Sequence, residues 1–306
     1  MIEVSAEFKN AVLSALTDVR TNYTGTDTGF AKKYGINPSV YNQIKKGIIE
    51  KKLSAPKWLE LGRKLKVSLS KRKWNMARTD VFNKIEGHVM FCKEFSKSRM
   101  LVDECAIGKT YSALYLERNI ENCFYVDGSQ CKTKNEFLRA LAKSVGAEWQ
   151  DSLFNVRESI KYILTELPKP VIIVDEAGDL EHGAFLALKE IWNATDGFCG
   201  WYLMGADGLR TKINRGKNKT KKEGYKELFS RFSSKYSSII PTNRLDKVDY
   251  YKKLITTVLA ANVSDDKIIN KIVKQCLASD EEAGEETGLR WAEGLLILAL
   301  NGIIEN

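Results

Sequence analysis

Eight consecutive residues, DECAIGKT at positions 103–110, have the types and spacing needed to bind the phosphates of a nucleotide. They follow the apolar run MLV, precede a helical pattern, and end in Gly108, Lys109 and Thr110. Backbone N–H groups at a helix start form a cradle for anions, the lysine reaches the terminal phosphates, and the threonine hydroxyl can bind magnesium. We therefore predict that ATP and Mg²⁺ bind here, with contacts from Asp103, Glu104, Cys105, Ala106, Ile107, Gly108, Lys109, Thr110 and Tyr111.

Two residues of this loop depart from the usual pattern, G-x-x-x-x-G-K-[ST]. Asp103 occupies the position of the first glycine, and Ala106 replaces a glycine that is common inside the loop. The side chain of Asp103 would place a negative charge near the phosphates, and like charges repel each other. We therefore expect a modest affinity for the nucleotide.

A pair of carboxylates, Asp175 and Glu176, directly follows the four apolar residues 171–174. A buried parallel strand that ends in this way would bring both acids to the phosphate loop, because ligands bind at the carboxyl ends of such strands. Asp175 would hold magnesium, mostly through water, and Glu176 would orient and deprotonate the attacking water. Each motif alone has a plainer interpretation, as a helix start without a ligand or a core strand before a polar turn. The two in this order favour a P-loop ATPase.

These side chains need a sheet to position them, and the pattern of apolar runs predicts one. The runs RMLVD, CFYVDG, VIIVDE and GWYLMGAD recur from residue 98 on, each followed by an amphipathic helical pattern. This alternation predicts an α/β core with a parallel sheet and helices on both of its faces. From Asp246 on the periodicity is purely helical, and we expect a small helical lid.

Residues 28–47, TGFAKKYGINPSVYNQIKKG, predict a helix, a tight turn at Gly35 and a second helix that starts at Asn37 and Pro38. The positions expected to face inward are Phe30, Tyr34, Ile36, Val40 and Ile44. The second helix would then present side chains suited to base edges and phosphates: Ser39, Asn42, Gln43, Lys45 and Lys46. Because the surrounding sequence is basic, we favour a DNA-binding helix-turn-helix over a plain helical hairpin.

The net charge of +9 is distributed unevenly along the 306 residues. Its excess lies almost entirely in the first 80 residues, and a second basic stretch, RTKINRGKNKTKKEGYK at 210–226, has eight basic residues and one acidic residue. Two separate basic regions indicate a polyanionic partner, of which nucleic acid is the common one. A solvated, lysine-rich surface is the alternative.

The six cysteines include no C-x-x-C pair, and the sequence has only two histidines. This composition argues against a zinc site and against a disulfide framework. The first residues lack the apolar core of a signal peptide, and the late apolar stretch Leu295 to Ile304 is too short to cross a bilayer. We expect a cytoplasmic protein with reduced thiols and no membrane association.

The phosphate loop and the segments VIIVDEAGDL, GWYLMGADGL, LFSRFSSKY and GLRWAEGLL resemble, in this order, parts of the AAA+ transposition ATPases. The resemblance extends from Ala77 to the end, although only the first two motifs are specific. It implies a P-loop AAA+ core with a helical lid and homo-oligomers with ATP at the subunit interfaces. It also implies filaments on double-stranded DNA that capture target DNA and activate a transposase.

The resemblance also suggests roles for three further residues. Arg231, in SRF, matches an arginine finger that reaches the γ-phosphate bound by a neighbouring subunit. Arg290, in GLR, matches a second sensor at the start of a lid helix. The first sensor would lie at the end of the fourth strand, and we assign it to Asp207. Either arginine could instead form a surface ion pair.

In such filaments DNA runs through a central channel, and basic residues after the second and fourth strands would line it. These are Lys132, Lys134, Arg210, Lys212, Arg215, Lys217, Lys219, Lys221 and Lys222. Contacts of this kind are made to phosphates and carry little sequence information.

The expected domains are a tethered helix-turn-helix domain (1–67), a basic linker (68–78), an AAA+ core (79–245) and the lid (246–306). Two other functions fit the same motifs. One is a helicase loader or replication initiator. The other is a non-enzymatic helix-turn-helix regulator that only senses ATP.

Overall fold

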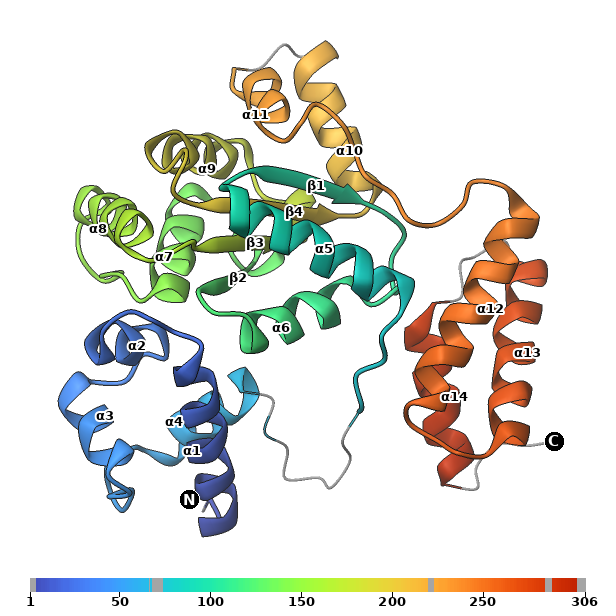
Figure 1. Cartoon of the computed structure of the whole chain (residues 1–306), viewed down its shortest axis with the longest axis horizontal. Coiled ribbons are helices and arrows are strands. Elements are labelled where there is room, and N and C mark those ends of the chain that lie inside the picture. Colours follow the sequence, from blue (N-terminus) through green and yellow to red (C-terminus); the bar gives the residue numbers. More distant parts are fainter. Residues whose placement is uncertain (1–3, 66, 68–73, 220–222, 284–287, 302–306) are drawn as a thin grey trace.

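The computed structural model describes residues 4–65, 67, 74–219, 223–283 and 288–301. In chain order it has amino-terminal helices, a parallel sheet with helices on both faces, and carboxyl-terminal helices (Figure 1). This arrangement confirms the α/β core with helical parts that the sequence predicts. No helix of the described residues is long and apolar enough to span a membrane.

The sheet in the described part of the chain has four parallel strands in the order β1-β4-β3-β2. Their bounds are β1 (Ser98–Val102), β2 (Cys123–Asp127), β3 (Val171–Asp175) and β4 (Gly200–Gly205). The strand before the phosphate loop, β1, and the strand before the acidic pair, β3, both pair with β4. Their carboxyl ends therefore lie at the same edge of the sheet, where ligands of parallel sheets bind.

Successive side chains of each strand enter two different hydrophobic clusters. Trp201 and Leu203 of β4 pack on one face with α7, α8 and α9, whereas Tyr202 and Met204 pack on the other face with α5 and α6. This is the period of two that a strand imposes on its side chains. Each fully buried large apolar side chain contributes about 1.5–3 kcal/mol to stability. The covering helices are α5 (Asp80–Phe95), α6 (Lys109–Asn119), α7 (Lys134–Val145), α8 (Leu153–Glu166) and α9 (His182–Ala194).

Short helical segments follow β4, at the top of Figure 1. They are α10 (Asp207–Asn214), a π-helical turn (Arg215–Lys219) and α11 (Tyr225–Arg231). Leu209, Ile213 and Leu228 anchor them in the same cluster as α9. The chain then returns to the outer edge of β1, where Ser237 forms a parallel bridge with Leu101.

The carboxyl-terminal helices have a cluster of their own. They are α12 (Arg244–Ala260), α13 (Asp266–Ala283) and α14 (Leu289–Leu300). Ile255, Ile272 and Leu296 lie in this cluster, whereas Tyr251 and Leu254 of α12 pack on the sheet with α5 and α6. One continuous helix is thus shared between the sheet and the carboxyl-terminal bundle. Residues 302–304 of the expected apolar helix lie outside the described residues.

The amino-terminal helices follow the predicted path of helix, turn and helix. They are α1 (Ala6–Thr21), α2 (Asp27–Lys33), α3 (Pro38–Lys45) and α4 (Ala55–Lys64). Side-chain oxygens of Ser5, Thr26 and Asn37 accept backbone hydrogen bonds and cap α1, α2 and α3. Gly35 adopts a left-handed φ of 62° in the turn. Of the residues expected to face inward, Val40 is half-buried and the others are buried, as is Tyr41, which was not predicted.

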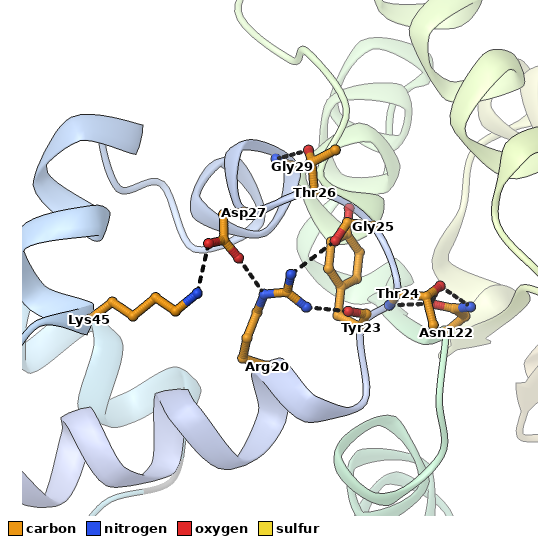
Figure 2. Close-up of polar contacts among 9 residues, drawn as sticks. All are labelled: Arg20, Tyr23, Thr24, Gly25, Thr26, Asp27, Gly29, Lys45 and Asn122. Carbon is orange, nitrogen blue, oxygen red and sulfur yellow. Dashed lines mark hydrogen bonds and ion pairs between the residues drawn. The ribbon is translucent and has the colours of Figure 1, made fainter.

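These helices pack directly on the sheet and its helices. The ring of Tyr23 lies 6.1 Å from that of Phe124 on β2, and its hydroxyl donates a hydrogen bond to the carbonyl oxygen of Val145 at 3.1 Å. Thr24 and Asn122 exchange side-chain hydrogen bonds of 2.7 and 2.9 Å (Figure 2). The apolar side chains of α1–α4 and α7 belong to one continuous cluster. The structure therefore corrects the expectation of a tethered amino-terminal module.

Arg20 holds the loop between α1 and α2 in the conformation that makes this contact. Its guanidinium donates to the carboxylate of Asp27 at 2.8 Å and to the carbonyl oxygens of Tyr23 and Gly25 (Figure 2). Nearby, Gly146 has a φ of 80°, and a Cβ atom there would lie 2.3 Å from the carbonyl oxygen of Gly29. The fit between α2 and the end of α7 is thus a backbone contact.

Candidate nucleotide-binding site

The phosphate loop connects β1 to the first turn of α6, as its motif requires. Gly108 has a φ of 97°, and Lys109 is the first residue of the helix. The lysine is 5% exposed, and its Nζ donates to the carbonyl oxygens of Asp103, at 2.8 Å, and Glu104. The ammonium is therefore held inside the loop, at the amino end of α6, where backbone N–H groups favour an anion.

The carboxylate of Asp175 lies beside this loop, although 65 residues separate it from Thr110. The hydroxyl of Thr110 donates to Oδ2 of Asp175 at 2.6 Å, and the hydroxyl of Tyr125 donates to the same oxygen at 3.3 Å. Burial raises the pKa of Asp175, and the hydrogen bond from Thr110 opposes this effect. Tyr125 was not predicted. Its position near the end of β2, next to β3, is the only sequence pattern that could have indicated it.

Glu176 follows β3 in a left-handed conformation with a φ of 44°. This backbone conformation costs a non-glycine residue about 1–3 kcal/mol and is concentrated at functional sites. Burial raises the pKa of Glu176, the negative charge of Asp175 raises it further, and Lys109 opposes both. A carboxyl group with a raised pKa that faces the cavity is suited to accept a proton from water.

A cavity of about 400 Å³ lies between the phosphate loop, Glu176 and other parts of the chain. Its volume lies in the range of small-molecule sites. One side of the lining is formed by the phosphate loop and Glu176. The other side comes from residues 74–77 and from the carboxyl-terminal helices, with the lining side chains Trp74, Met76, Ala77, Val258, Leu289, Arg290 and Glu293. The lining thus combines a phosphate loop with several apolar side chains, which suits a ligand that carries both phosphates and a base.

The segment 74–77 lies in the expected linker, so its place in the cavity was missed. The hydroxyl of Tyr111 donates to the carbonyl oxygen of Trp74 at 3.0 Å, and Asn75 donates to the carbonyl oxygen of Ala261 at 2.9 Å. One indication in the sequence was that this segment packs against the rest of the chain: Trp74 and Met76 are large and apolar, although basic residues surround them. Residues 68–73 of the linker lie outside the described residues.

The carboxylate of Asp103 does not face the phosphates. Its Oδ2 accepts hydrogen bonds from the backbone N–H groups of Ile239 and Ile240, the second at 3.2 Å, and its Oδ1 accepts one from Glu104 at 2.9 Å. Asp103 is 7% exposed. The expected repulsion between this side chain and the phosphates has no basis in the structure, because the side chain points toward the connection that leads to α12.

Ala106 also has a structural partner, at the start of α14. Its carbonyl oxygen accepts a hydrogen bond from the N–H of Leu289 at 2.7 Å. A Cβ atom on Gly288 would lie 2.4 Å from Cβ of Ala106. The alanine is accommodated because the facing residue is a glycine, and this contact brings Arg290 to the cavity.

Two predicted residues do not reach the cavity of their own chain. The carboxylate of Asp207 is 86% exposed and lies 3.6 Å from Arg210, so the structure does not support it as a first sensor. It occupies the first turn of α10, beyond the end of β4, and points to solvent. Arg231 donates to Asn193 at 2.8 Å and lies over the ring of Trp192, and it does not line the cavity of its own chain. A finger at Arg231 would have to act on another subunit.

The described basic residues proposed for a DNA channel differ in their contacts. Lys212 donates to the carbonyl oxygens of Gly178 and Leu180, Lys217 lies 3.5 Å from the ring centroid of Phe229, and Arg210 lies over Tyr236. Lys212, Lys217 and Arg210 thus contact other residues of the chain, whereas we expected them to contact DNA. Lys132, Lys134 and Arg215 are exposed, although Lys132 also forms an ion pair of 3.7 Å with Asp179. Lys221, Lys222 and the side chain of Lys219 lie outside the described residues.

On the predicted recognition helix, α3, Ser39 and Asn42 are exposed and Gln43 is half-buried, and Lys46, directly after it, is exposed. Lys45 forms an ion pair with Asp27 at 2.9 Å (Figure 2). Because Asp27 also binds Arg20, this lysine is engaged within the amino-terminal helices. The exposed face of α3 is therefore narrower than the sequence predicts.

The donor set at the phosphate loop fits magnesium. Thr110 and Asp175 already share a short hydrogen bond, and both offer the oxygen ligands that Mg²⁺ prefers. Among the described residues no group of three histidine, cysteine or acidic side chains could hold a metal. When bound, magnesium would neutralise charge on the β- and γ-phosphates.

Residues 100–213 match a protein family described as an AAA domain. The match begins in β1, includes the phosphate loop and the acidic pair, and ends in α10. Together with the fold and the site, it identifies this part of the chain as the P-loop core of an ATPase of the AAA+ class. No curated protein matches the chain.

Proposed function

We propose that the four residues at the loop and at the end of β3 divide the work of ATP hydrolysis. Lys109 neutralises the terminal phosphates, Thr110 and Asp175 hold magnesium, and Glu176 takes a proton from the attacking water. The observation that carries this proposal is that side chains from α6 and from the end of β3 meet at one site. Lys109, Thr110 and Glu176 line the cavity, and Asp175 accepts the hydrogen bond of Thr110. Arg290 enters the cavity from α14 and would contact the phosphates.

We further propose that hydrolysis takes place between copies of this chain. Arg231 does not line its own cavity, and the residue is half-buried at the surface formed by α9 and α11. A neighbouring subunit that placed its cavity against this surface would receive the arginine. The residues 79–245 then act as the core and 246–306 as a lid, with the described residues 74–77 serving as part of the nucleotide site.

DNA is the partner that the charge distribution favours. The net charge is +9, and exposed basic or amide side chains occur both on α3 and after β2 and β4. We propose that residues 1–67 form a helix-turn-helix that contacts duplex DNA through Asn42 and Lys46. Lys132, Lys134 and Arg215 would line a second, sequence-independent surface.

The order of the motifs suggests the biological setting. It is similar to that of the AAA+ transposition ATPases, and most closely to the B protein of bacteriophage Mu. We therefore propose that the protein oligomerises on double-stranded DNA with ATP, captures a target and activates a partner transposase. A helicase loader with the same core would form no complex with a transposase.

The proposal is tested with Lys109→Ala and Glu176→Gln in parallel. Loss of the lysine should abolish ATP-dependent DNA binding, whereas the glutamine variant should bind ATP, hydrolyse it very slowly and form longer-lived complexes on DNA. Anisotropy of a labelled duplex, turnover and electron microscopy of the complexes measure these effects. Equal loss of ATP binding in both variants contradicts the assigned roles. Absence of any ATP effect on DNA binding contradicts the DNA function but not the ATPase.

A further inference from the structure

The phosphate loop is fastened to α12 by a side chain that the loop motif does not specify. Oε2 of Glu104 accepts a hydrogen bond from the hydroxyl of Tyr251 at 2.6 Å, and its Oε1 lies 2.7 Å from Nζ of Lys247. Tyr251 is 4% exposed, and the side chains of Glu104 and Lys247 are 23% and 24% exposed. Hydrogen bonds to charged groups that are shielded in this way are stronger than those between neutral groups.

Two more contacts join the same loop to the carboxyl-terminal part. Asp103 accepts the N–H groups of Ile239 and Ile240, just before α12, and Ala106 accepts the N–H of Leu289 at the start of α14. Asp103, Glu104 and Ala106 of the loop thus contact α12, the chain before it, and the start of α14. Helices α12 and α14 also supply residues that line the nucleotide cavity. The side chain of Glu104 does not itself line that cavity.

Helix α12 connects the contact at Tyr251 with residues at the nucleotide cavity. Tyr251 and Val258 are seven residues apart and lie on the same face of one continuous helix. Val258 lines the cavity, and α12 packs on α14, which supplies Leu289, Arg290 and Glu293. A shift of α12 at Tyr251 would therefore move both Val258 and Arg290 relative to the phosphate loop.

We propose that Glu104 is a positioning residue for ATP binding. Through Tyr251 and Lys247 it locks α12 to the phosphate loop and so holds Val258 and Arg290 at the nucleotide. The inference rests on the proposed role of the cavity as the ATP site. It differs from that role because Glu104 contacts the helix and not the nucleotide.

Glu104→Ala and Tyr251→Phe should each raise KM and the dissociation constant for ATP by roughly tenfold, which is the scale of one hydrogen bond to a charged group. The value of kcat at saturating ATP should change little, because the contact acts on the bound ground state and the transition state alike. The double variant should be no worse than Glu104→Ala, since both substitutions remove the same hydrogen bond. Glu104→Gln, which keeps an acceptor for Tyr251, should be intermediate.

Asp80→Asn is the matched control. It removes the ion pair of 2.6 Å between Asp80 and Lys253, which joins α12 to α5 and not to the phosphate loop. KM for ATP should stay at the wild-type value. Thermal unfolding without nucleotide shows whether each variant is folded.

Cys105 gives a second, direct measurement. It is exposed in the phosphate loop, whereas the other five cysteines are buried. Its reaction with a small thiol reagent should be slowed by ATP, and in Glu104→Ala the same protection should need roughly tenfold more ATP. No protection in the wild type would refute the nucleotide site itself. Protection in the wild type with unchanged KM in Glu104→Ala, or an equal rise of KM in Asp80→Asn, would refute the positioning role alone.

Discussion

The carboxyl group of Glu176 is subject to opposing influences at the end of β3. Burial and the neighbouring Asp175 favour its protonated form, whereas Lys109 favours the ionised form, and the net effect is a pKa above the usual 4.5. The raised pKa makes Glu176 a better proton acceptor once it is ionised. Its left-handed backbone indicates that the fold tolerates strain in order to aim this side chain at the cavity.

This shift predicts how turnover depends on pH. The base acts in its ionised form, so the rate should fall as the pH is lowered through the pKa of Glu176. Because that pKa is raised, the fall should begin at a higher pH than for an ordinary glutamate. Rates should be measured at saturating ATP and Mg²⁺, which keep Asp175 ionised. The slow residual turnover of Glu176→Gln should not show this fall at low pH. If the variant showed the same fall, the titrating group would be a residue other than Glu176.

Asp103 allows a prediction that separates two interpretations of the loop. If its carboxylate repelled phosphates, Asp103→Gly would restore the common glycine and tighten ATP binding. The structure predicts no such gain, because the substitution leaves the N–H groups of Ile239 and Ile240 without their acceptor, and the hydrogen bond of Ile240 is buried. We expect a loss of about 1–3 kcal/mol of stability and no gain in affinity. Denaturant unfolding and ATP titration measure both quantities.

Asp103→Asn serves as the comparison for this substitution. The amide retains one oxygen that can accept the same backbone hydrogen bonds, so most of the stability should remain. A glycine variant that was as stable as the wild type and bound ATP more tightly would show that the carboxylate acts on the phosphates after all.

At the scale of elements, the sequence predicts the strands well and their long-range neighbours poorly. VIIV followed by Asp175 and Glu176 identified β3 because a buried parallel strand is apolar throughout, and the phosphate loop marked the start of α6. Trp74 was missed because the segment that contains it is irregular and gains its role only from contacts with Tyr111 and the carboxyl-terminal helices. Periodicity carries no information on such contacts.

Helix α11 gives a prediction about assembly. If the arginine acts on a neighbouring subunit, Arg231 and Lys109 of the same chain serve two different nucleotide sites. Arg231→Ala and Lys109→Ala should each be inactive alone, but a mixture should regain turnover, because some interfaces combine an intact lysine with an intact arginine. At equal amounts roughly a quarter of head-to-tail interfaces would be intact. ATP turnover across a series of mixing ratios tests this, and no recovery at any ratio contradicts a finger in trans.

At the scale of the whole molecule, the placement of the amino-terminal helices could not have been predicted. The helix–turn–helix path follows from local signals such as Asn37 and Pro38, whereas its attachment depends on Thr24 meeting Asn122 and on Gly29 meeting Gly146. These pairs are about a hundred residues apart, and neither has a recognisable motif. Docking fixes α3 relative to the nucleotide site, so the amino-terminal helices and this site belong to one packed unit.

Removal of residues 1–67 should therefore destabilise the ATPase core and not merely weaken DNA capture. Phe124 is 1% exposed and is covered by Tyr23 and Lys33. Its exposure, with that of neighbouring apolar side chains, would lower the unfolding temperature and favour aggregation, because each such side chain contributes about 1.5–3 kcal/mol when buried. Thermal unfolding and light scattering of the truncated protein measure these effects.

Two full-length variants distinguish docking from DNA contact. Gly146→Val adds a branched side chain where φ is 80° and Gly29 leaves no room, so it should loosen α2 from α7 and lower the unfolding temperature. Asn42→Ala combined with Lys46→Ala changes exposed residues of α3 and should leave the unfolding temperature within error while weakening DNA binding. Two results together would contradict docking: a truncated core as stable as the full chain, and a wild-type unfolding temperature for Gly146→Val. The amino-terminal helices would then be a tethered module whose packing contributes nothing to stability.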